Sequence, residues 1–231
     1  MLSILCVTKA ENHTPTFLLR MAQAASILHG ECVFAADGAE AFARLRGMTD
    51  VVVKPVNSKG YLENVLEEAV RACSGDYILR IDDDEALSPC LMAWLVDGGY
   101  KAHDHWKFAR AHVWPGDSLC ILNPPLWPDH QTGLSVKAKS GGRHTVHAGS
   151  PFGGGRLAPA VLEHHKFVVK TVAERREIAA RYDAYHPGYG TGGFTPFNMP
   201  EEVWTPEQRD IRTLHYADWL AQDDANKQTA A

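Results

Sequence analysis

The sequence lacks the features of a secreted or membrane-anchored chain. Its five cysteines are scattered singly through 231 residues, and none belongs to a C-x-x-C pair. An odd number of isolated cysteines predicts reduced, mostly buried thiols in a cytosol-like compartment. No basic cluster precedes the first apolar run, and that run, residues 2–7, is far too short for a signal or membrane segment. We therefore expect a cytoplasmic protein without stable membrane insertion.

The chain also lacks an excess of positive charge, an internal repeat and a low-complexity tract. Its net charge of −5 argues against a general binder of polyanions. Hydrophobic residues make up 45% and charged residues 22%, as in soluble globular proteins. Because 231 residues can bury one sizeable core, we expect a single domain.

The most informative stretch, residues 76–89, joins a short apolar run to a block of acids. Residues 77–81 are rich in β-branched and aromatic side chains and predict a buried strand. Four consecutive acids, 82–85, follow directly, and adjacent carboxylates repel one another and resist unpaired burial. The strand must therefore end there, with the acids at the edge where open α/β sheets bind ligands. A hard cation such as Mg²⁺ or Mn²⁺ would relieve this charge.

The spacing of these acids suggests how such a cation would be held. In extended backbone, Asp82 and Asp84 would point to one face and Asp83 and Glu85 to the other. An Asp-x-Asp pair on one face suits a metal ion that bridges to a diphosphate, with the second carboxylate available to a ribose hydroxyl. The pattern therefore favours a metal and nucleotide site.

A simpler interpretation of the same acids is a turn before a helix. Ser88 and Pro89 are a good N-cap and first helical residue for a helix over residues 90–96. The strand in front of the acids, the helix behind them and the pattern upstream nevertheless favour a ligand site.

The segments upstream of the acids alternate between strands and helices. Strands are predicted at residues 2–7, 31–36 and from 50, and helices at 14–27, 39–46 and 62–73. Three strand–helix units before a fourth strand predict a parallel, Rossmann-like α/β sheet with right-handed crossovers.

Downstream of residue 97 the rhythm changes. Strands are predicted at residues 106–113, 120–122 and 157–165, separated by a loop-rich segment over 124–155. A helix is predicted over 171–185 with residues 174–177 on its exposed side, and a second, frayed helix over 201–231.

Several of these motifs together resemble the family 2 glycosyltransferases with a GT-A-type fold. The similarity covers most of residues 2–185, and its nearest part is SGDYILRIDDDE at 74–85, which resembles the family pattern aGdyilflDaDd. WPDHQTGL at 127–134 and TVH at 145–147 are similar to the stretch Pd.Q.RLf…vHE, although Gly133 and Ala148 replace its usual Arg and Glu. LEHHK at 162–166 is similar to a late segment whose histidine often completes the metal site.

The resemblance implies a fold, a reaction and partners. It implies one GT-A-type domain with a nucleotide-sugar-binding half over 1–97, an acceptor-side half over 98–200 and a helical tail over 201–231. It implies metal-dependent, inverting transfer of a sugar from a nucleotide diphosphate, with a UDP-sugar favoured and Mn²⁺ or Mg²⁺ as cofactor. The acceptor stays open among a glycan, a protein, a lipid and a modified nucleobase.

The resemblance also implies roles for individual residues. The metal ligands are Asp84 and His164, with Asp82 and His165 as further candidates. The substrate-binding residues are Thr8, Glu11, Asn12, Asp37, Lys59, Asn64, Asp82 and Asp83, of which Asp37 would accept from a base N–H and Asp82 would lie near the ribose or sugar. The candidate general bases are Asp129 and, second, His147.

Two other functions use features of the same sequence. A nucleotidyltransferase shares this type of sheet, but it usually has a Gly-rich, basic loop after the first strand, whereas residues 8–13 contain neither Gly nor Arg. A catalytically degenerate binding module would agree with Gly133 and Ala148, but the intact Asp82 and Asp84 argue against it.

Overall fold

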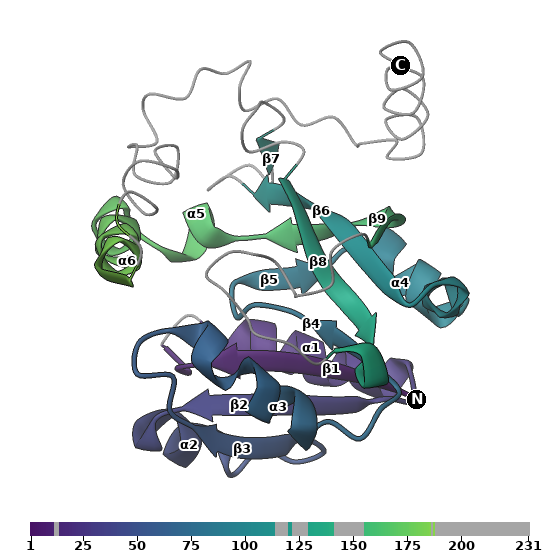
Figure 1. The fold of residues 1–231 in the computed structure, drawn as a ribbon, viewed down its shortest axis with the longest axis horizontal. Coiled ribbons are helices and arrows are strands. Elements are labelled where there is room, and N and C mark those ends of the chain that lie inside the picture. The colour runs from purple at the N-terminus through teal and green to yellow at the C-terminus, as the bar shows by residue number, and fades with distance from the viewer. Residues whose placement is uncertain (12–13, 114–119, 122–128, 141–154, 186, 188–231) are drawn as a thin grey trace.

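The computed structural model describes residues 1–11, 14–113, 120–121, 129–140, 155–185 and 187. They form a mixed α/β fold around a nine-stranded sheet of order β3-β2-β1-β4-β8-β6-β9-β5, with β7 paired to β6 (Figure 1). The strands are β1 (Leu2–Thr8), β2 (Glu31–Asp37), β3 (Val52–Val56), β4 (Tyr77–Arg80), β5 (Glu85–Leu87), β6 (His105–Val113), β7 (Cys120–Ile121), β8 (Asp129–Val136) and β9 (Arg156–His164). The helices are α1 (Pro15–Ile27), α2 (Ala39–Leu45), α3 (Leu66–Ala72), α4 (Pro89–Val96), α5 (Lys166–Val169) and α6 (Val172–Tyr185), with short 3₁₀ turns at Leu62–Val65, Gly99–Ala102 and Lys137–Lys139.

Strands β3, β2, β1 and β4 are all parallel, which confirms the predicted Rossmann-like half. Successive residues of β1 enter two different cores. Ile4 and Cys6 pack in the core that contains α1, α2 and α4, whereas Leu5 and Val7 pack in the core that contains α3. The continuous apolar run therefore reflects a strand that is covered by helices on both faces.

The second half of the sheet is mixed rather than parallel. Strand β8 pairs antiparallel with both β4 and β6, β6 pairs parallel with β9, and β9 pairs antiparallel with β5. Both β5 and β8 depart from the sequence prediction, which assigned these residues to the acid block and to a loop-rich segment. Strand β8 of the second half pairs directly with β4 of the first, so the two predicted halves share one sheet. The boundary predicted near residue 97 stays a prediction.

Two side chains differ from prediction in their exposure. Arg175, expected on the exposed side of its helix, is buried: its guanidinium lies 4.9 Å from the ring centroid of Phe167 and donates to the carbonyl of Lys170 at 2.7 Å. Cys90, expected to be buried, is exposed, while Cys6, Cys32 and Cys73 are buried free thiols. No helix among the described residues is long and apolar enough to cross a membrane. The predicted helix over 201–231 lies outside the described residues.

Candidate functional site

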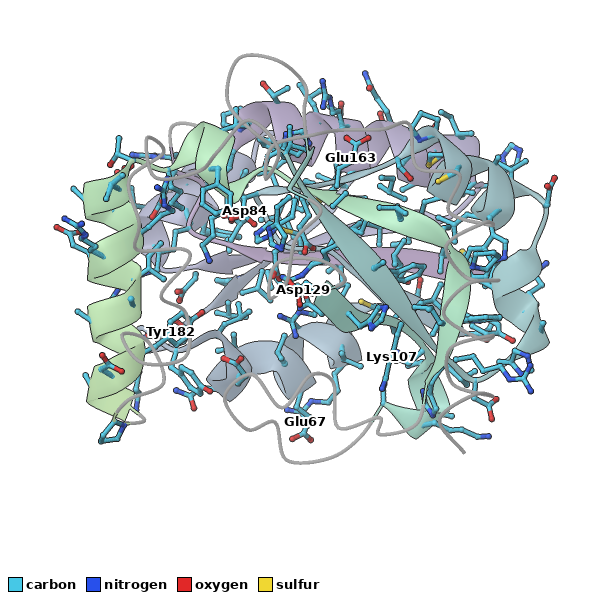
Figure 2. The ribbon with its side chains drawn as sticks, turned by 90° about the horizontal axis from the view of Figure 1, so that it is seen from above. Glu67, Asp84, Lys107, Asp129, Glu163 and Tyr182 are labelled. Atoms are coloured by element: carbon cyan, nitrogen blue, oxygen red, sulfur yellow. The ribbon has the colours of Figure 1, made fainter. Side chains whose placement is uncertain are left out.

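The acids after β4 form a tight turn. The N–H of Glu85 donates to the carbonyl of Asp82 at 3.0 Å, and the N–H of Asp82 donates to the Glu85 carboxylate at 2.9 Å. The predicted alternation of the acids between two faces is therefore wrong, because the chain turns instead of staying extended. Asp82 faces Arg80, with 3.3 Å between Oδ1 and Nη2, whereas Asp84 faces His164, with 3.4 Å between Oδ1 and Nε2. In Figure 2, Asp84 and Asp129 lie near the centre of the molecule and Glu67 lies at its rim.

A row of polar side chains crosses four adjacent strands beside this turn. The register places Arg110 of β6 opposite Asp129 of β8, and His112 of β6 opposite His164 of β9. It also places Glu85 of β5 opposite His164. Because directly paired residues point to the same face of a sheet, these side chains meet although their strands are far apart in sequence.

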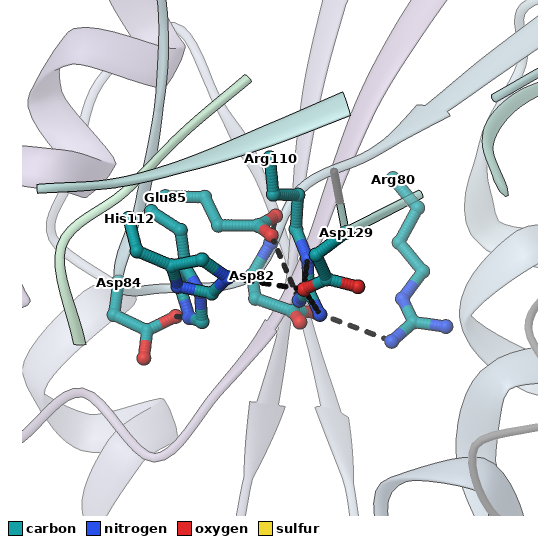
Figure 3. A network of polar contacts seen from close by, with 8 residues as sticks. Arg80, Asp82, Asp84, Glu85, Arg110, His112 and Asp129 are labelled. Atoms are coloured by element: carbon teal, nitrogen blue, oxygen red, sulfur yellow. Dashed lines mark hydrogen bonds and ion pairs between the residues drawn. The ribbon is translucent and has the colours of Figure 1, made fainter. Parts of the chain in front are cut away.

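These residues form a continuous network (Figure 3). Arg110 donates to Asp129 Oδ2 from Nε at 2.9 Å and from Nη2 at 2.5 Å, and its Nη1 lies 3.5 Å from Glu85 Oε1. The ring of His112 contacts Asp129 Oδ2 through Nε2 at 3.1 Å and His164 Nδ1 through its own Nδ1 at 2.9 Å. The side chains of His112 and His164 are 0% and 3% exposed, so the network is largely shielded from water.

Burial and mutual repulsion raise the pKa values of two of the four acids in the turn. Burial and the charge of Asp84 raise the pKa of Asp83 to about 7, and burial with the charge of Asp82 raises the pKa of Glu85. Burial also opposes ionisation of Asp84, but His164 and Lys166 outweigh it and hold the pKa of Asp84 well below its usual value. The site therefore favours an added positive charge.

The pKa shifts of Asp84 and His164 imply different charge states for the His164 ring. Burial lowers the pKa of His164 in spite of the neighbouring Asp84, and an uncharged ring cannot stabilise that carboxylate by charge. A ring with no exposed surface to solvate its charge is favoured in the neutral form. The counter-charge of Asp84 then has to come from Lys166, from Lys170 or from a bound cation.

The loop after β1 lies against the acid turn. The hydroxyl of Thr8 donates to Asp83 Oδ2 at 2.6 Å and accepts from the N–H of Ala10 at 2.9 Å. Glu11 forms an ion pair with Lys170 at 2.5 Å, which ties the loop to the residue after α5. The structure thus brings two predicted nucleoside-binding residues, Thr8 and Glu11, to the site, while Asn12 lies outside the described residues.

Three further predicted substrate-binding residues gather around Ser58. The carboxylate of Asp37, at the end of β2, accepts from the N–H of Ser58 at 2.8 Å and from its hydroxyl at 2.6 Å. The Asn64 amide donates to the Ser58 carbonyl at 2.9 Å. Lys59, the residue after Ser58, has a φ of 52°. These contacts hold the turn after β3 against the end of β2, and a role of the three residues in reading a base stays a prediction.

The two adjacent histidines point in different directions. His164 faces Asp84, whereas Nε2 of His165 lies 3.3 Å from Glu163 Oε2 and its ring centroid lies 5.2 Å from that of Phe17. The His165 N–H donates to the Asp84 carbonyl at 2.7 Å, so both residues lie at the acid turn, but it is the His164 ring that faces the Asp84 carboxylate. A metal-binding role for either ring stays a prediction.

Of the two candidate general bases, Asp129 lies among the described residues. Burial alone would raise the pKa of Asp129, but the contacts with His112 and Arg110 outweigh it and hold that pKa well below the usual range. In this state Asp129 anchors the network, and its use as a general base stays a prediction. His147 lies outside the described residues.

Sequence reasoning missed Arg110 and His112, which connect the two ends of the network. Their signal was present, because they are two residues apart in a predicted strand and so share one face. Arg and His are seldom buried in a strand without a partner, so their presence there predicts a partner on a neighbouring strand.

In the described part of the chain, no group of three or more His, Cys, Asp and Glu side chains is arranged to hold a metal ion. Asp84 and His164 nevertheless fit as two ligands of one ion. Ligands about 2.1 Å from an octahedral ion and at right angles lie about 3 Å apart, and here Oδ1 and Nε2 are 3.4 Å apart. Mg²⁺ commonly takes only one or two protein carboxylates and completes its shell with water and substrate phosphates.

No family model and no curated protein matches the chain. Similar solved structures include residues 1–349 of TarS from S. aureus, with a TM-score of 0.46 and 12% identity over 95% of this chain and 78% of that one. The bifunctional IspDF from Campylobacter jejuni has a TM-score of 0.47 and 12% identity over 78% of this chain and 53% of that one. A nucleotidyl transferase from Methanothermobacter thermautotroptrophicus has a TM-score of 0.33 and 19% identity over 50% of this chain and 64% of that one. A TM-score below 0.5 does not identify an activity, so the reaction has to be inferred from the site.

Proposed function

We propose that the protein is a metal-dependent glycosyltransferase that moves a sugar from a nucleotide diphosphate to an acceptor hydroxyl. The observation that carries this proposal is the convergence of Asp84 and His164, 3.4 Å apart, in a turn of four consecutive acids. The turn directly follows a parallel strand, which is where ligands bind in α/β sheets.

Each part of the site has a role in this reaction. A Mg²⁺ or Mn²⁺ ion held by Asp84 and His164 would stabilise the negative charge that develops on the departing diphosphate. Lys166 and Lys170 both lower the pKa of Asp84, and they are the candidates to bind phosphate oxygens. Asp82, whose side chain is 30% exposed and held by Arg80, offers a carboxylate to a ribose or sugar hydroxyl.

The donor and the acceptor are proposed from the resemblance and from the position of the loops. A UDP-sugar is the favoured donor, with Thr8 and Glu11 beside the acid turn and Asp37 at the end of β2 on the nucleoside side. The transfer is proposed to be inverting, with a base on the acceptor side, where Asp129 and His147 are the candidates. The same chemistry would serve a glycan, protein, lipid or modified nucleobase acceptor.

The proposal is tested by measuring UDP release from a panel of UDP-sugars with and without Mn²⁺. We expect Mn²⁺-dependent release by the unaltered protein and a loss of about 100- to 1000-fold in Asp84→Asn, because the ion loses a charged ligand beside the leaving group. Asp104→Asn is the matched control: Asp104 is half exposed and pairs with Lys139 on the surface.

Other outcomes would favour the alternatives. Release that is unchanged in Asp84→Asn would contradict the assigned site. Pyrophosphate exchange into a nucleoside triphosphate without sugar transfer would indicate a nucleotidyltransferase. Absence of turnover together with metal-independent nucleotide binding would indicate a degenerate binding module.

A further inference from the structure

The contact between His112 and His164 fixes the position of their protons. Their Nδ1 atoms are 2.9 Å apart, so one must donate a hydrogen and the other must accept it. His112 Nε2 lies 3.1 Å from Asp129 Oδ2, which is an acceptor only, so His112 carries its proton on Nε2. The two rings are 0% and 3% exposed, and a ring without water to solvate its charge is favoured in the neutral form, with one proton. With both rings neutral, the Nδ1 atom of His112 is the acceptor and the proton of His164 lies on Nδ1.

This arrangement leaves the Nε2 lone pair of His164 directed at the acid turn, 3.4 Å from Asp84 Oδ1. Two electron-pair donors that face each other at this distance suit a cation between them. An imidazole binds a metal only through an unprotonated nitrogen, and the hydrogen bond of the other nitrogen decides which one that is.

We propose that His112 is a positioning residue: anchored by Asp129, it keeps the proton of His164 on Nδ1 and thereby presents Nε2 to a divalent cation beside Asp84. This inference rests on the proposed function, because it assigns a residue to the cation site of the same reaction. His112 acts on the proposed ion through the ring of His164.

The surrounding contacts hold this chain of hydrogen bonds in place. The parallel register of β6 and β9 sets His112 directly opposite His164. Arg110 donates a hydrogen bond to the same Asp129 oxygen that accepts one from His112. The ring of Phe167 packs edge-on to that of His112, with 6.2 Å between the ring centroids. Rotation of either ring would break these contacts, so the tautomer is set by the fold.

The first test is the protonation pattern in the metal-free protein. Long-range ¹H–¹⁵N correlation spectra of the histidine rings should show His164 as the Nδ1–H tautomer and His112 as the Nε2–H tautomer. A His164 ring that carries a proton on Nε2, alone or together with one on Nδ1, would overturn the proposal without any reference to activity.

The second test compares two variants of His112 for Mn²⁺ affinity in the presence of UDP, measured by electron paramagnetic resonance. His112→Leu removes the acceptor and should weaken Mn²⁺ binding by about 10- to 100-fold. His112→Asn places an amide oxygen near the position of Nδ1 and should restore most of the affinity and the Nδ1–H signal of His164. Rescue by asparagine but not by leucine is not expected of a residue that only fills space.

The outcomes separate this inference from the proposed function. If the unaltered protein binds Mn²⁺ and His112→Leu binds it equally well, this inference is overturned and the cation site stands. If the unaltered protein binds no Mn²⁺ with UDP, both are overturned.

Discussion

Arg110 is the residue on which the charge balance of the site depends most directly. Its guanidinium contacts Asp129 on the neighbouring strand and Glu85 on β5, and its side chain is only 16% exposed. Burial of a cation is tolerated here because two carboxylates share it. Removal of Arg110 would leave both acids in a shielded environment without that cation.

We therefore expect Arg110→Met to lower the free energy of unfolding by about 3–5 kcal/mol, since breaking a buried ion pair leaves uncompensated charge. Arg71→Met is the matched control: Arg71 pairs with Glu67 on the surface of α3, and its loss should cost about 0–0.5 kcal/mol. Urea unfolding of both variants measures the difference. Equal losses would mean that Arg110 contributes no more than a surface pair.

At the scale of the element, β8 is the strand that joins the two halves of the sheet. Its sequence, DHQTGLSV, is polar and contains a glycine, so it has little of the β-branched and aromatic character of a strand. It forms because its main chain pairs on both sides, with Tyr77–Leu79 of β4 and with β6. Pairing with neighbours, rather than local preference, therefore produces this strand.

Gly133 shows how closely β8 packs. A Cβ at this position would lie 2.9 Å from Cδ2 of Phe108, a ring with no exposed surface. The glycosyltransferase pattern that this segment resembles has an Arg here, and the absence of a side chain in this protein allows the buried ring to lie directly on the strand.

We expect Gly133→Ala to destabilise the protein by about 1–3 kcal/mol, because the added methyl group overpacks a filled core. Gly47→Ala is the control, since a Cβ at Gly47 meets nothing within 4 Å. Its effect on the free energy of unfolding should be neutral or stabilising by up to about 1 kcal/mol. Thermal unfolding of the two variants checks this, and a neutral Gly133→Ala would show that Phe108 can move aside.

At the scale of the whole molecule, the candidate site belongs to both halves of the sheet. The acids come from the turn between β4 and β5, whereas their partners come from β6, β8 and β9. A ligand that binds this site only in the folded state should therefore stabilise the entire domain, not one half of it.

With Mn²⁺ and UDP near 100 times their dissociation constants, we expect a stabilisation of about 2.7 kcal/mol. For a chain of this length that corresponds to a rise in melting temperature of about 5–10 °C. Asp84→Asn should lose most of the rise and Asp104→Asn should keep it. A rise of equal size in all three proteins would place the ligand elsewhere.

The sequence alone was sufficient for the parallel half of the fold and for the location of the acids. Apolar runs and helix periodicity predicted β1, β2 and β4 with the helices between them, because local burial patterns decide such elements. The acid block pointed to Asp84 as part of a metal site, and the family resemblance added His164, which the structure brings within 3.4 Å of it.

Only the tertiary structure decided the turn of the acids, the existence of β8 and the network of Arg110 and His112 with Asp129 and His164. These depend on which strands are neighbours and on their register, and a register is a property of pairs of distant segments. A one-residue shift of β9 against β6 would send His164 to the opposite face, away from His112, while leaving every local pattern in the sequence unchanged.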